Sequence, residues 1–163
     1  VCVNAVKQSA EAIQHVSHQH DRYIDIALEA VSQNAASMLY VKKDTQLDKK
    51  FVLAAISRNA KVITFMNDVL KSDDQFIEDI ARQGDADCLV EFGLLVDRLA
   101  ENTILNIVKI INIRMSQDQS YRKNVNQIFS KIPIAISQYL FSKYSHKDSK
   151  RGQIEKLLTC FRK

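Results

Sequence analysis

The chain has 163 residues, 46% of them hydrophobic, which is enough to bury a core and excludes wholesale disorder. Only three glycines and one proline are present, too few turn-forming residues for an all-β or α/β chain of this length. The net charge of +4 combines an acidic middle with a basic end: residues 71–101 hold three basic and nine acidic side chains, net −6, whereas residues 118–163 hold ten basic and three acidic, net +7. We therefore predict an all-α protein.

The first half of the chain repeats itself every 25 residues. AVKQSAEAIQHV at 5–16 aligns without gaps with AVSQNAASMLYV at 30–41 and with AISRNAKVITFM at 55–66. The entry to the unit recurs as well, because QLDKKFVLAAI at 46–56 is similar to KSDDQFIEDIA at 71–81. A short fixed period of this kind is typical of stacked helical repeats.

Each unit is predicted to contain two short helices. The first helix begins after an aspartate that can cap it, Asp48 or Asp73. It ends near Asn34 or Asn59, because asparagine tolerates the left-handed conformation that closes many helices. Its apolar stripe follows i, i+1, i+4, i+5 spacing and in one unit consists of Phe51, Val52, Ala55 and Ile56. A helix pair this short cannot bury its stripe alone, so we predict solenoid-like stacking of successive pairs.

Residues 48–77, with an Ala-Ala-Ile helix followed by an Asn-Ala turn, resemble the repeat family called domain of unknown function 4116. The likeness covers about 1–80, although this chain has alanine at 10, 35 and 60, where glycine is usual in the family, and serine at 9 in place of asparagine. The resemblance implies an effector protein that an intracellular bacterial pathogen injects into the host cytosol. It implies no enzymatic activity, because none is assigned to the family.

The second half has a different helical pattern. Residues 92–115 predict one long central helix, or two helices with a break near 102–103. An amphipathic helix is expected over 120–132, and Pro133 then begins or kinks another helix. An exposed loop over 145–152 and a terminal helix over 153–163 complete the chain.

The predicted organisation is therefore a helical repeat array over 1–85 and a C-terminal helical bundle over 86–163 packed on it. We expect one continuous unit, with an independent second domain as the alternative. Because Val1 already lies inside a helical pattern, we also expect the chain to be a fragment of a longer protein.

Three of the four histidines lie within six residues, in HVSHQH at 15–20. His15 and His18 could hold a zinc ion if Asp21 or Cys2 joined them, but no paired C-x-x-C or H-E-x-x-H accompanies them.

The repeat gives each of these histidines a structural explanation. His15 aligns with Tyr40 and Phe65 and is expected to pack in or against the core. His18 aligns with charged residues, which indicates a solvated face, and His20 lies at the junction to the next unit. We therefore expect no metal and no other cofactor.

No catalytic residue is predicted. Cys88 follows the acidic segment GDAD, which disfavours a reactive thiolate, and Cys160 lies on or beside an apolar helix face. The three cysteines are widely spaced and odd in number, as expected for free thiols in a reducing compartment. No calcium-loop spacing and no glycine-rich phosphate loop occurs. An enzyme whose site is assembled only in three dimensions stays an alternative.

The basic end suggests a further alternative, a domain that binds an anionic membrane surface. Its candidate patch consists of Lys143, Lys147, Lys150 and Arg151. A pI of about 8.9 is only mildly basic and no nucleic-acid-reading motif is present, so nucleic acid is not the expected partner. No apolar run is long enough to span a membrane.

We predict a non-enzymatic protein-interaction module, and the resemblance implies that its partner is a host protein. In stacked repeats the solvent positions of successive units are available for binding. The candidate partner-binding residues at such positions are Gln33, Lys43, Arg58 and Lys61. The oligomeric state is left open.

Overall fold

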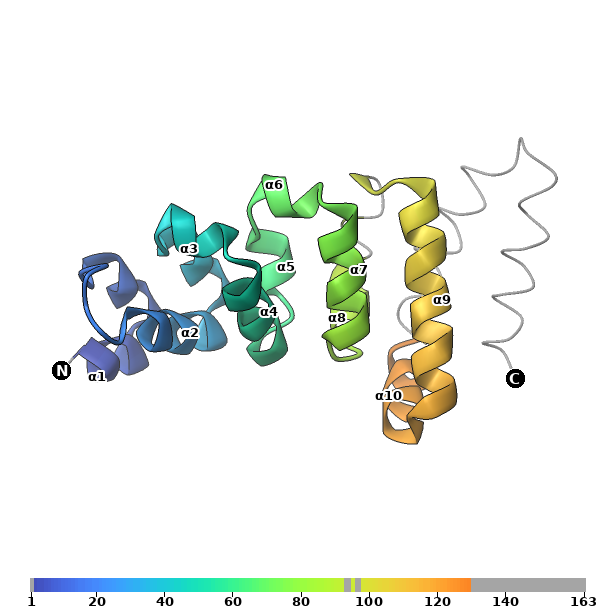
Figure 1. The fold of residues 1–163 in the computed structure, drawn as a ribbon. Helices are drawn as coiled ribbons and strands as arrows, with labels where there is room; N and C mark the ends of the chain where they lie inside the picture. Colours follow the sequence, from blue (N-terminus) through green and yellow to red (C-terminus); the bar gives the residue numbers. More distant parts are fainter. Residues whose placement is uncertain (1, 93–94, 96–97, 130–163) are drawn as a thin grey trace.

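The computed structural model describes residues 2–92, 95 and 98–129, and every regular element within them is a helix (Figure 1). The elements follow one another from the N-terminus at one end of the molecule towards α9 and α10 at the other. The predicted all-α fold is confirmed for these residues.

Four helices form the first member of each helix pair, and they end 25 residues apart. They are α1 (Cys2–Gln8), α2 (Tyr23–Gln33), α4 (Lys49–Arg58) and α7 (Asp74–Gln83). Each packs against the next of the four in chain order. In α2, α4 and α7 the same four positions are buried, which in α4 are Phe51, Val52, Ala55 and Ile56. The apolar stripe predicted from the sequence is therefore the face that these helices bury.

The ends of these helices are set by polar side chains. Asp48 and Asp73 each accept a backbone N–H hydrogen bond within the following helix, at 2.9 and 3.0 Å, as predicted. The preceding helices do end at Asn34 and Asn59, but neither residue is left-handed, since their φ angles are −140° and −154°. Instead, each side-chain oxygen accepts the N–H two residues further on. The asparagines are conserved in register because they start the next helix as the last one stops.

The second member of each pair is a single short helix. These helices are η1 (Ala10–His15), η2 (Ala35–Tyr40), α5 (Val62–Phe65) and α8 (Cys88–Phe92). They also contact one another in chain order, and the first two are tighter 3₁₀ helices. Ile13, Met38, Ile63 and Cys88, each 25 residues from the next, are all buried. The 25-residue register therefore continues as far as Cys88, beyond the point where the side-chain similarity fades.

The long helix predicted over 92–115 is interrupted. Helix α8 ends at Phe92 and α9 (Glu101–Gln117) begins nine residues later, so the two-helix alternative is correct. The break precedes the predicted position by a few residues. Helix α9 packs against α7 and buries Ile104, Ile107 and Ile111, whereas Ile113 faces solvent. It is amphipathic rather than central.

The last described helix, α10 (Gln119–Phe129), packs against α9 and matches the predicted amphipathic segment. Tyr121 and Val125 are its buried residues. The predictions for Pro133, for the loop over 145–152 and for the helix over 153–163 fall outside the described residues.

Candidate interaction surface

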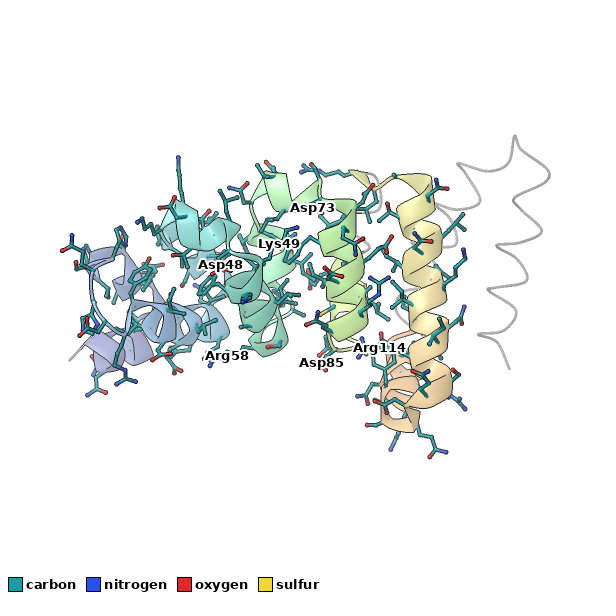
Figure 2. The ribbon with its side chains drawn as sticks, in the orientation of Figure 1. Asp48, Lys49, Arg58, Asp73, Asp85 and Arg114 are labelled. Atoms are coloured by element: carbon teal, nitrogen blue, oxygen red, sulfur yellow. The ribbon has the colours of Figure 1, made fainter. Side chains whose placement is uncertain are left out.

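The long helices give the molecule two different edges. Figure 2 shows Asp48 and Asp73, which begin α4 and α7, towards one edge, and Arg58 and Asp85, which follow their other ends, towards the opposite one. We call the first the N-terminal edge; it also carries α3 (Lys43–Leu47) and α6 (Asp68–Lys71). The second, the C-terminal edge, consists of the turns at residues 34, 59 and 84.

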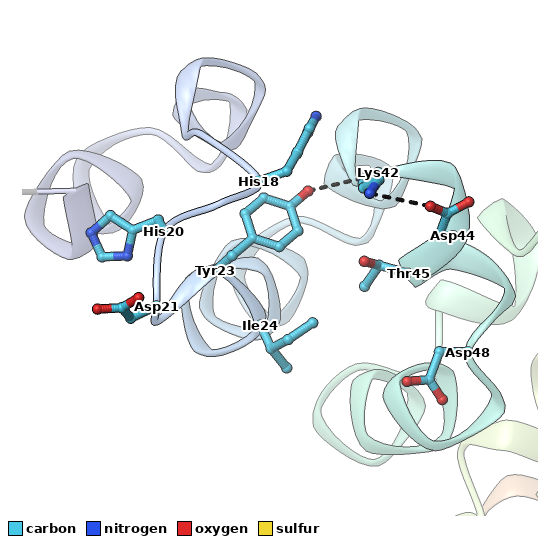
Figure 3. Close-up of a pocket in the computed structure, with 9 residues that line it drawn as sticks. All are labelled: His18, His20, Asp21, Tyr23, Ile24, Lys42, Asp44, Thr45 and Asp48. Atoms are coloured by element: carbon cyan, nitrogen blue, oxygen red, sulfur yellow. Dashed lines mark hydrogen bonds and ion pairs between the residues drawn. The ribbon is translucent and has the colours of Figure 1, made fainter.

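The N-terminal edge has an open polar hollow of about 370 Å³ between the first two units (Figure 3). Tyr23 anchors it, because its buried hydroxyl accepts the backbone N–H of Lys42 at 2.9 Å. Lys42 also forms a 3.2 Å ion pair with Asp44 on the rim. The remaining lining residues are His18, His20, Asp21, Ile24, Thr45 and Asp48.

The three clustered histidines are all exposed. His18 lies edge-on to the ring of Tyr23, with ring centroids 5.1 Å apart, and His20 accepts the backbone N–H of Arg22 through Nδ1. The expected packing of His15 in the core is wrong. In this part of the chain, and in the rest of the described residues, no three His, Cys, Asp or Glu side chains gather as potential metal ligands.

His15 is exposed because of the helix that carries it. Ile13 and Val16, three residues apart, form the buried side of η1. With 3.0 residues per turn, a side chain two positions after Ile13 is rotated by about 240° and leaves that side. The aromatic slot seen in the repeat is therefore a surface position.

That position forms an exposed row along the short helices. We define the exposed row as His15, Tyr40, Phe65 and Val90, each 25 residues from the next. Tyr40 and Val90 are 44% and 43% exposed, His15 is exposed and Phe65 is half-buried. Leu39, next to the row on η2, is 61% exposed. The repeat alignment already showed the aromatic part of this row, but it did not show which face the residues occupy.

The four candidate partner-binding residues are all exposed, but they do not lie together. Arg58 and Lys61 flank one turn of the C-terminal edge, and Gln33 occupies the position equivalent to Arg58 in the preceding unit. Lys43 begins α3 at the opposite edge (Figure 1).

A buried cluster joins α7, α8, α9 and α10. Nη1 of Arg114 donates to the carbonyl oxygens of Ala81 and Gly84, at 2.9 and 2.6 Å, and so satisfies the end of α7. The guanidinium carbon lies 3.9 Å from the ring centroid of Tyr121. Burial raises the pKa of Tyr121. The Arg114 contacts indicate that this cluster holds the helices together.

Cys88 belongs to the same cluster and is poorly suited to nucleophilic chemistry. Burial, reinforced by the charge of Asp85, raises the pKa of its thiol to about 12. Very little thiolate is therefore present near neutral pH, in agreement with a core role.

The basic patch predicted at Lys143, Lys147, Lys150 and Arg151 lies outside the described residues, so it stays a prediction. None of the helices that the structure describes is long and apolar enough to cross a membrane.

Comparisons with protein-family models, with curated proteins and with solved structures found no match for this chain. A functional assignment therefore has to be argued from the surface of the molecule itself.

Proposed function

We propose that this chain is a non-enzymatic scaffold that binds a protein partner on the surface of a solenoid-like stack of 25-residue helix pairs. Two features support the stack: successive pairs contact one another in chain order, and the buried positions recur at the same spacing. In a stack of this kind the repeated apolar positions make the core, which leaves the outer positions free to bind.

The exposed row is the observation that carries the proposal. Solvent positions of a stable helix need no apolar side chains, yet Tyr40, Phe65 and Val90 place them at one equivalent position in three adjacent units. Aromatic and apolar side chains gathered on a surface mark protein interfaces. The neighbouring Leu39 widens the apolar strip.

The kind of partner is proposed from the repeat resemblance. It suggests a bacterial effector, so the partner would be a protein of the host cytosol. Gln33, Lys43, Arg58 and Lys61 stay candidates for additional polar contacts.

The test is quantitative capture from a eukaryotic cell lysate with the immobilised chain, read by mass spectrometry. Replacing Val90 in the exposed row by lysine should reduce the captured partner about tenfold or more, as expected for a charge placed in an apolar contact. Val69→Lys is the matched control, because Val69 is equally apolar and 67% exposed but lies on α6 at the N-terminal edge.

Val69→Lys should capture as much partner as the unaltered chain, and circular dichroism should show both variants folded. Capture that Val90→Lys leaves unchanged, or that both substitutions reduce equally, contradicts the exposed row as the binding face.

A further inference from the structure

The turns at the C-terminal edge can be compared directly, because α2, α4 and α7 end at equivalent positions. Residues 34, 59 and 84 follow these helices, and each donates its backbone N–H to the carbonyl oxygen four residues earlier. The first two are asparagines and the third is Gly84. The difference in side chain has a structural consequence between the units.

Asn59 closes the gap between α2 and α4. Its Nδ2 donates to the carbonyl oxygens of Val31 and Ser32, at 3.2 and 3.3 Å, which are among the last carbonyls of α2. Its Oδ1 accepts the N–H of Lys61 at 3.2 Å. One carboxamide thus satisfies both the end of one helix and the start of another.

The next gap, between α4 and α7, has no such side chain. The carbonyls equivalent to those of Val31 and Ser32 belong to Ile56 and Ser57, and within the described residues neither accepts a hydrogen bond from outside its helix. A hollow of about 340 Å³ lies at this place, and its lining includes Ile56, Ser57 and Gly84.

The chain cannot close this second gap from position 84. A Cβ atom on Gly84 would lie 2.7 Å from Sγ of Cys88 and 2.7 Å from the carbonyl oxygen of Ile80. Both distances are well inside van der Waals contact, and the second involves backbone. An asparagine therefore does not fit where the repeat would place one.

We propose that this hollow binds the carboxamide of an asparagine or glutamine presented by the protein partner. The amide would donate to the carbonyl oxygens of Ile56 and Ser57, as Asn59 does one unit earlier. The end of a helix carries partial negative charge and favours N–H donors. Leu53 and Ala54 supply apolar walls for the methylene groups.

A neutral amide fits better than a cation. Lys50 lines the hollow and Arg58 directly follows Ser57, so a lysine or arginine of the partner would meet like charge. This inference rests on the proposed function, since it names the chemistry of a group on the protein partner. It concerns a place at the C-terminal edge, distinct from the exposed row.

The test is a titration of the ¹⁵N-labelled full chain with N-acetyl-asparagine N′-methylamide, followed by NMR. Saturable shifts are expected at the amides of Ile56, Ser57 and Gly84. The corresponding aspartate and leucine derivatives, which lack the amide donor, should bind about tenfold more weakly, as expected when a hydrogen bond is lost.

Two variants localise the binding. Ala54→Phe should fill the hollow and abolish the shifts, while the rest of its spectrum shows that the chain is folded. Glu29→Phe is the matched control, because residue 29 is equivalent to residue 54 in the unit whose gap Asn59 already fills; its response should be unchanged.

Equal affinity for the leucine derivative, shifts that persist in Ala54→Phe, or no saturable shifts with the asparagine derivative would each overturn the inference. These outcomes leave the capture experiment on the exposed row unaffected. Conversely, amide binding in the hollow together with capture that ignores Val90→Lys would refute only the proposed binding face.

Discussion

Asn59 shows how much one residue contributes when it sits between two units. Its amide nitrogen reaches the last carbonyls of α2 and its oxygen starts the turn before α5. Asn34, at the equivalent position one unit earlier, is recorded with the second of these interactions only, its oxygen accepting the N–H of Ala36 at 3.0 Å. The pair therefore separates the value of capping from that of inter-unit hydrogen bonding.

Asn59→Ala should lower the free energy of unfolding by about 2–3 kcal/mol, because it removes a cap and leaves two carbonyls of α2 without their donor. Asn34→Ala should cost about 1 kcal/mol, the usual value of a cap. Urea unfolding of both variants measures the difference. Equal losses would mean that the contacts to Val31 and Ser32 contribute nothing.

At the scale of helices, α4 and α7 are tied together at their starts. Nζ of Lys49 lies 2.6 Å from Oδ2 of Asp73, the residue that caps α7, and 5.6 Å from the ring centroid of Phe76. The hydrogen bond from Lys49, followed by that from the Phe76 N–H, lowers the pKa of Asp73. The carboxylate is therefore the form that the folded state favours.

The sign of the pH dependence follows. Because the pKa of Asp73 is lower in the folded state than in the unfolded chain, its stabilisation is present above about pH 4 and is lost as the pH falls through the folded-state pKa. Urea midpoints of the wild-type chain should thus fall more steeply between about pH 5 and pH 3 than those of Asp73→Asn. Asp74→Asn, a change at the exposed neighbour, should keep the wild-type slope; if Asp73→Asn keeps it too, the Lys49–Asp73 pair has no such role.

Most of the helical framework could be predicted from the sequence, because it depends on local signals. The 25-residue alignment located the capping aspartates, the asparagine turns and the buried stripe of α4. What it could not supply was the rotation of the short helices. A 3₁₀ helix and an α-helix differ in the angle per residue, and that angle moves His15 and Tyr40 from the expected core to the surface.

The two edges were also beyond sequence reasoning. Lys43 and Arg58 both occupy solvent positions, yet the direction of the polypeptide places them at opposite edges. The hollow at Gly84 depends on a missing side chain and on the position of Cys88, neither of which has a sequence signature. A glycine at an asparagine position of the repeat is the one signal that could have directed attention there.

At the scale of the whole molecule, the order of contacts from α1 to α9 favours an extended stack over a closed bundle (Figure 1). In such an arrangement each unit touches only its neighbours, so its surface lengthens with every repeat. Both proposals depend on this, because the exposed row and the hollow use equivalent positions in successive units.

The distance between spin labels at equivalent positions tests this arrangement most directly. Gln8, Gln33, Arg58 and Gln83 are exposed and end successive long helices. Labels can be attached in pairs through introduced cysteines after Cys2 and Cys160 are replaced by serine, since Cys88 is buried. Pulsed electron–electron resonance then measures each pair.

With helices packed about 10 Å apart, the stack predicts that the distance to residue 83 increases in similar steps from residue 58 to 33 to 8. Labels at 8 and 83 should be farthest apart. A distance between residues 8 and 83 equal to or shorter than that between 33 and 83 would show that the units close on themselves, and would contradict the extended repeat surface on which the account rests.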